Sequence, residues 1–137
     1  MSRKDAETQN YFMTENEISK HVVDIAFLIH SELGPGLLES VYEEIMCYEL
    51  AIRGLQIERQ KAMPVLWDEL KMDLGFRTDI IVESKVIIEL KSVEKISPIH
   101  PKQLLTYLKI SGLKLGLLIN FNETLIKNGI TRVVNNL

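Results

Sequence analysis

The stretch Val86–Glu94, VIIELKSVE, reads as a strand for the interior of a sheet, because β-branched residues and leucine fill its first half. It nevertheless carries two charges, Glu89 and Lys91, which lie two residues apart and therefore share one face of the strand. Burying either charge without a partner would cost several kcal/mol. The segment therefore predicts a central strand that holds either a functional site or an ion pair.

The preceding segment Thr78–Val82, TDIIV, predicts the antiparallel partner of this strand across a tight turn. Asp79 then lies opposite or diagonal to the stretch around Glu89, and either register brings the two carboxylates within reach of a common ion. Crowded carboxylates repel unless a cation offsets them, and Mg²⁺ (or Mn²⁺) takes such oxygen ligands. Lys91 would stabilise charge on the attacking water or on a phosphate. The alternative is an ion pair between Lys91 and one of the two carboxylates.

The periodicity of the remaining chain predicts two helices, a run of antiparallel strands, a third helix and a final pair of strands. Helices are expected over residues 14–33, 37–53 and 97–111, and extended segments over residues 55–67, 70–82, 84–93, 114–122 and 129–134. This order predicts an α/β class, with α and β segments mixed around one sheet flanked by helices. Residues 1–13 read as a flexible tail and residues 14–137 as a single domain.

The composition, 46% hydrophobic and 26% charged over 137 residues, is that of a soluble globular protein. No apolar run approaches the roughly 20 residues of a membrane span, so no membrane partner is expected. The single cysteine, Cys47, cannot form an internal disulfide, which favours a cytoplasmic location.

The net charge is divided unevenly along the chain. Residues 1–76 hold 7 Lys/Arg against 14 Asp/Glu (net −7), and residues 77–137 hold 9 against 5 (net +4), which together give −3. A basic C-terminal half permits contact with a phosphate backbone without requiring it.

Four further residues are candidates. Gln103 and Tyr107 lie four residues apart, on one side of the third helix and away from its leucines; a plain boundary pair is the alternative. Glu39 is either a first-turn acid favoured by the helix dipole or a third carboxylate aimed at the sheet. Arg77, two residues before Asp79 on the same strand face, either contacts substrate or pairs at the surface.

The spacing Gly36-x-x-Glu39-x-x-Tyr42 resembles the signature of the GxxExxY family of small bacterial and archaeal proteins. The likeness covers roughly residues 16 to 135 and continues through ERQ (58–60), FRTDIIVESKVIIELKSVE (76–94) and HPKQLLTYLKISGLKLGLLINFN (100–122). That family is assigned to the PD-(D/E)XK nuclease-like superfamily. The resemblance implies a restriction-endonuclease-like core, a mixed sheet flanked by helices.

The resemblance also implies roles for individual residues. Asp79 matches the metal-binding Asp of the superfamily, although Thr78 stands where its Pro would be. Glu89-Leu90-Lys91 matches (D/E)-X-K, with the Leu90 carbonyl as a further metal ligand.

Glu39 matches the acidic residue that the first core helix often supplies. Gln103 and Tyr107 resemble the QxxxY motif of nuclease domains attached to recombination-repair helicases, where it contacts substrate.

These residues together predict a metal-dependent nuclease in which a metal-bound water attacks a phosphodiester in line. Asp79, Glu89 and Glu39 would hold Mg²⁺ or Mn²⁺, Lys91 would position the water, and Gln103 and Tyr107, with Arg77, would bind the substrate. DNA is the expected substrate in preference to RNA, and a homodimer is left open. The alternative is a non-catalytic module that keeps the fold in order to bind nucleic acid or protein.

Overall fold

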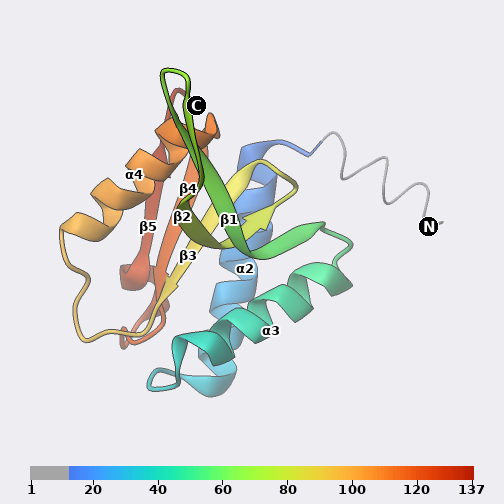
Figure 1. Cartoon of the computed structure of the whole chain (residues 1–137). Coiled ribbons are helices and arrows are strands. Elements are labelled where there is room, and N and C mark those ends of the chain that lie inside the picture. Colours follow the sequence, from blue (N-terminus) through green and yellow to red (C-terminus); the bar gives the residue numbers. More distant parts are fainter. Residues whose placement is uncertain (1–12) are drawn as a thin grey trace.

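The computed structural model of the chain describes residues 13–137 (Figure 1). The tail expected over residues 1–13 therefore lies outside the described residues, apart from Met13. The Met13 side chain is buried with the main apolar core, and its carbonyl accepts a hydrogen bond from Lys85 Nζ at 2.6 Å.

The described chain contains three α-helices, five strands and one short 3₁₀ helix. In chain order these are α2 (Glu15–Leu33), α3 (Glu39–Ile52), β1 (Ile57–Trp67), β2 (Leu70–Val82), β3 (Val86–Lys91), α4 (Ile99–Ser111), β4 (Leu115–Asn120), η1 (Ile126–Gly129) and β5 (Ile130–Val134). Every helix and strand that the sequence predicts is present. The second helix begins two residues later than expected because Leu38 has extended backbone.

The five strands form one mixed sheet in the order β1-β2-β3-β4-β5. All neighbours are antiparallel except β3 and β4, which are parallel and are joined by the crossover through α4. Between β2 and β3, Ile80 pairs with Ile88. Continued by one residue, this register sets Asp79 opposite Glu89, which decides between the two registers that the sequence permits.

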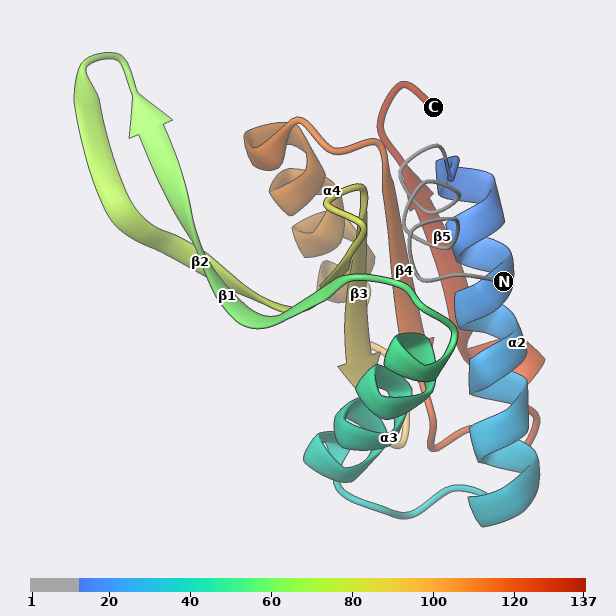
Figure 2. The same ribbon diagram turned by 90° about the vertical axis from the view of Figure 1, so that its right-hand side faces the viewer.

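Helices cover both faces of the sheet (Figure 2). One face packs with α2 and α3 around the larger core, which includes Ile88 and Leu90 of β3. The other face packs against α4 around a smaller core that includes Ile87 and Leu104. Because side chains alternate along a strand, Glu89 shares the α4 face with Ile87. The fold thus directs the charged positions of β3 toward α4.

Helix α2 begins at a capping box. Thr14 Oγ1 accepts a hydrogen bond from the backbone N–H of Glu17 at 3.2 Å. The apolar stripe that follows, from Ile18 to Ile29, is buried against the sheet. The helix ends at Gly34, whose φ of 70° a residue with a side chain rarely adopts.

Strands β1 and β2 extend past the rest of the sheet as a two-stranded ribbon (Figure 2). We call residues 65–74 the arm. The ribbon is irregular where it leaves the sheet, because the β1–β2 register shifts between Met63 and Val65. Glycine is required there: a Cβ on Gly75 would lie 1.9 Å from Val65 Cγ2.

We expect Thr14→Ala to lower the free energy of unfolding by about 1 kcal/mol, because the N–H of Glu17 loses its acceptor. Urea denaturation of the wild type and the variant measures this difference. Thr14→Asp, which restores an acceptor, should recover most of the loss. Equal destabilisation by both variants would contradict the capping role.

Candidate functional site

The carboxylate of Asp79 lies against the backbone of β3. Its Oδ2 accepts a hydrogen bond from the N–H of Leu90 at 2.9 Å, and its Oδ1 accepts one from Gln60 Nε2 at 3.3 Å. Hydrogen bonds to both oxygens fix the orientation of this carboxylate at the point where β2 and β3 separate.

Glu89 is the most perturbed carboxyl group of the site. Its pKa is raised from 4.5 to about 9, chiefly because the group is buried and secondly because the Asp79 carboxylate lies beside it; the positive charge of Lys91 lowers the pKa by less. Its Oε1 is buried and has no hydrogen-bond partner among residues 13–137. A buried acceptor next to a second carboxylate fits a cation, since a divalent ion would satisfy the oxygen and offset both charges.

Lys91 is half-buried, and by strand alternation it lies on the same face of β3 as Glu89. Within the described residues its ammonium makes no ion pair with Glu89 or with Asp79. The alternative that the sequence allows, an ion pair between Lys91 and one of the two carboxylates, is therefore not formed among the described residues. Within residues 13–137 no ion pair holds the ammonium, although its charge still lowers the pKa of Glu89.

Helix α4 contributes Gln103 and Tyr107 to the same side of the sheet. The pKa of Tyr107 is raised by burial first and then by the charges of Glu89 and Asp79, while a hydrogen bond from Gln103 lowers it. The structure thus brings the two α4 residues together and places the Tyr107 hydroxyl within the field of the carboxylates.

Phe76, which the sequence did not single out, stacks on Tyr107 with ring centroids 4.2 Å apart. The two rings line a cavity of about 470 Å³ between α4 and β2, whose full lining is Gly75, Phe76, Ile99, Lys102, Gln103, Thr106 and Tyr107. Aromatic rings beside a cation and an amide form a surface suited to a nucleotide. The only sequence signal for Phe76 was its place just before the segment of Asp79.

A second network reaches Asp79 from α3. Gln60 Nε2 also donates to Glu43 Oε1 at 2.7 Å, so one amide bridges the two carboxylates. Glu43 is only 7% exposed and also accepts Arg59 Nη2 at 2.9 Å. Arg59 contacts Glu44 as well, through Nη1 at 2.9 Å. Glu43 is not among the site residues that the sequence predicts; its signal is helical spacing, which places it on the buried face of α3.

Gln60 holds a backbone conformation with φ of 48°, unusual for a residue with a side chain. Arg77 Nη1 donates to the Gln60 carbonyl at 2.7 Å. This contact supports the strained residue that orients Asp79. Arg77 is therefore linked to the site indirectly: it contacts Gln60, and Gln60 in turn donates a hydrogen bond to Asp79.

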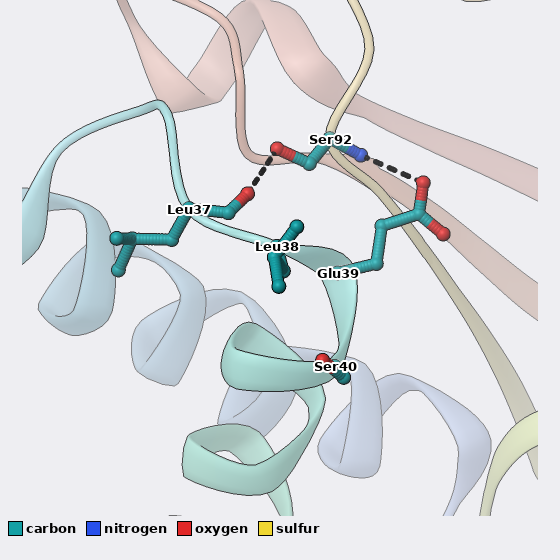
Figure 3. Close-up of a pocket in the computed structure, with 5 residues that line it drawn as sticks. All are labelled: Leu37, Leu38, Glu39, Ser40 and Ser92. Carbon is teal, nitrogen blue, oxygen red and sulfur yellow. Dashed lines mark hydrogen bonds between the residues drawn. The ribbon is translucent and has the colours of Figure 1, made fainter.

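Glu39 lies at the first turn of α3, where its side chain points toward Ser92 (Figure 3). Its Oε2 accepts the N–H of Ser92 at 3.3 Å, and Ser92 Oγ donates to the Leu37 carbonyl at 2.6 Å. These residues line a shallow cavity of about 360 Å³. Within residues 13–137 no three His, Cys, Asp or Glu side chains group as a metal cluster, so the structure does not gather Glu39 with Asp79 and Glu89.

The remaining signature residue, Tyr42, closes the turn between α2 and α3. Its hydroxyl donates to the Gly34 carbonyl at 2.7 Å and accepts the N–H of Leu37 at 3.2 Å. Its ring is fully buried and stacks on Phe121, with centroids 4.3 Å apart. Tyr42 is thus a structural residue.

Residues 16–133 match the family model of the PD-(D/E)XK nuclease superfamily. The chain belongs to this superfamily, and the mixed five-stranded sheet flanked by helices confirms the expected fold. Comparisons with curated proteins and with solved structures found no match. No helix in the described part of the chain is long and apolar enough to cross a membrane.

The raised pKa of Glu89 predicts how the metal-free protein responds to pH. Between pH 4.5 and about 9 the folded protein keeps a proton that the unfolded chain releases. The stability from this group is therefore fully present below pH 4.5 and is lost as the pH rises through about 9. We expect urea denaturation in EDTA to show wild-type stability falling across this window.

Glu89→Gln should remove this component of the pH dependence, because the amide stays neutral throughout. A wild-type profile that keeps the same slope in the variant would contradict the assignment to Glu89.

Proposed function

We propose that this protein is a divalent-metal-dependent nuclease that hydrolyses phosphodiester bonds of nucleic acid. Membership of the nuclease superfamily supports the class of reaction. The observation that carries the metal dependence is the buried Oε1 of Glu89, which lies beside the Asp79 carboxylate and has no hydrogen-bond partner within residues 13–137. A buried acceptor in that setting is costly unless a cation completes it.

Asp79 and Glu89 would hold the cation, with the Leu90 carbonyl as a further ligand and Mg²⁺ or Mn²⁺ as the ion. A cation bound there supplies Lewis acidity at the phosphodiester and lowers the pKa of water nearby. Glu39 is not proposed as a ligand, because its carboxylate is held by the Ser92 N–H apart from the pair.

The protein's own residues supply position and charge. The Lys91 ammonium, free of an ion pair within the described residues, would hold the attacking water and stabilise negative charge growing on the phosphate. Gln103 and Tyr107 would orient the substrate strand, and Phe76 would support the Tyr107 ring by stacking.

The domain bounds, the narrower family and the kind of nucleic acid are also proposed. Residues 14–137 would form one domain of the GxxExxY family, with the Tyr42 clamp accounting for part of its signature. DNA is the proposed substrate in preference to RNA, and the net charge of +4 over residues 77–137 supports binding of a phosphate backbone.

The second candidate is a binding module that does no chemistry. The observation that favours it is that both oxygens of Asp79 already accept a hydrogen bond, from the Leu90 N–H and from Gln60. In such a module the carboxyl of Glu89 stays protonated and no metal is needed.

Calorimetric titration of Mn²⁺ and Mg²⁺ separates the two candidates. We expect saturable binding to the wild type and its loss in Glu89→Gln, because the variant removes one of two carboxylate ligands. Glu32→Gln, an exposed carboxylate at the end of α2, is the matched control and should bind as the wild type does. Absence of binding to the folded wild type would leave the binding module as the function.

Lys91→Ala tests the catalytic role of the ammonium. We expect the cleavage rate of a DNA substrate with Mg²⁺ or Mn²⁺ to fall by about 10²-fold, with metal affinity retained. Lys109→Ala, an exposed lysine on α4, serves as the control. A Lys91→Ala protein that cleaves at the wild-type rate would exclude the role proposed for this residue.

A further inference from the structure

The arm carries a group of strongly exposed apolar side chains. Trp67, the single tryptophan, is 76% exposed, and Leu70 and Leu74 are each 59% exposed. Trp67 pairs with Leu70, and Val65 pairs with Met72, so these four side chains share one face of the ribbon. The arm therefore presents an uncovered apolar face far from either core.

A two-stranded ribbon without a packed face is at best marginally stable in water. The arm projects away from the sheet (Figure 2), and its residues belong to neither of the two apolar cores. An apolar ribbon of this kind is normally covered by another chain.

The charge of the arm argues against nucleic acid as that partner. Its charged residues are Asp68, Glu69 and Asp73 against Lys71, which gives a net charge of −2. A phosphate backbone is repelled by such a surface.

The sequence of the arm instead matches itself. Residues 70–74 read Leu-Lys-Met-Asp-Leu, so an antiparallel copy centred on Met72 sets each Lys71 opposite Asp73 of the second chain, and each Leu70 opposite Leu74. Opposite charges and apolar pairs facing each other across strands are stabilising. The centre of this pairing lies on the two-fold axis of a symmetric dimer.

The edge that this pairing needs is open. Strand β2 pairs with β3 only from Ile80 to Val82, and in the described residues no strand pairs with the outer edge of residues 70–74. The edge of β1 is blocked by Pro64 and by the register shift beside it. Within the arm, β2 therefore offers the longer unpaired edge, over residues 70–74 against residues 65–67 of β1.

We propose that the arm binds a second copy of this chain by antiparallel pairing of the two β2 edges about Met72. Its five exposed apolar side chains, Leu66, Trp67, Leu70, Met72 and Leu74, present on the order of 600 Å². Leu66 lies on the opposite face of the ribbon, and edge pairing covers only those parts of the other side chains that face the second copy, so the paired backbones and the Leu70–Leu74 and Lys71–Asp73 contacts carry the association. The proposal does not depend on nuclease activity.

Sedimentation equilibrium of the full chain and its charge variants tests the pairing. Lys71→Glu and Asp73→Lys should each weaken the wild-type dimer by about tenfold, because each sets like charges face to face at two symmetric places. The double variant should restore the affinity, since the charges are then merely exchanged. Loss of dimer in both single variants without restoration in the double variant would overturn the register.

Cysteine cross-linking locates the two-fold axis. Met72→Cys should form an intermolecular disulfide under mild oxidation, because residues facing each other across antiparallel strands lie about 4.5–5.5 Å apart at Cα, within disulfide reach. Leu70→Cys alone should form little intermolecular disulfide, and it should cross-link when mixed with Leu74→Cys. The native Cys47 is buried and does not compete.

Tyr48, 67% exposed on α3, provides both a control and a rival surface. Tyr48→Lys should leave the dimer intact. A dimer broken by Tyr48→Lys, a wild type that stays monomeric at its highest soluble concentration, or a Lys71→Glu variant that loses only DNA affinity would each overturn the proposal.

Discussion

The hydrogen bond from the Leu90 N–H to Asp79 Oδ2 is the contact on which the site depends. The regular pairing of β2 and β3 ends at Ile80 and Ile88, and beyond it a side chain instead of a backbone carbonyl takes the next N–H. A carboxylate in this place satisfies the donor while β2 turns away from β3. The same divergence sets Asp79 beside Glu89 and sends β2 outward into the arm.

Stability and chemistry are opposed at this point of the fold. Two carboxyl groups lie at the border of an apolar core, where burial raises the pKa of Glu89 to about 9 and leaves one oxygen without a partner in the described chain. The surrounding structure adds strain of its own, since Gln60, which hydrogen-bonds Asp79, has a φ of 48° and its carbonyl accepts a hydrogen bond from Arg77. Such arrangements are characteristic of sites that bind an ion or a substrate.

The sequence was sufficient for the fold because its signals are local. Alternation along β3 separates Glu89 from Ile88, and the capping box at Thr14 and the glycine after Ser111 mark the ends of helices. The same alternation predicted that the Asp79 and Glu89 carboxylates would lie close together.

The rest of the site depends on contacts between distant elements, which spacing does not encode. The bridge from Glu43 through Gln60 to Asp79 joins a helix to two strands. It depends on a positive φ at Gln60, and a glutamine gives no sequence signal for that conformation. Glu39 shows the converse. Its place in a motif suggested a metal ligand, yet the first turn of α3 turns its carboxylate to Ser92.

The clamp formed by Tyr42 bears on how relatives of this chain can be recognised. Its hydroxyl ties together the two ends of the α2–α3 turn, on the face of the sheet opposite to the carboxylate pair. A signature built on this tyrosine therefore identifies the geometry of the α2–α3 turn and contains no information on the carboxylate pair. A chain that had lost both carboxylates could keep this tyrosine and the turn that it supports, so the carboxylate pair has to be looked for on β2 and β3.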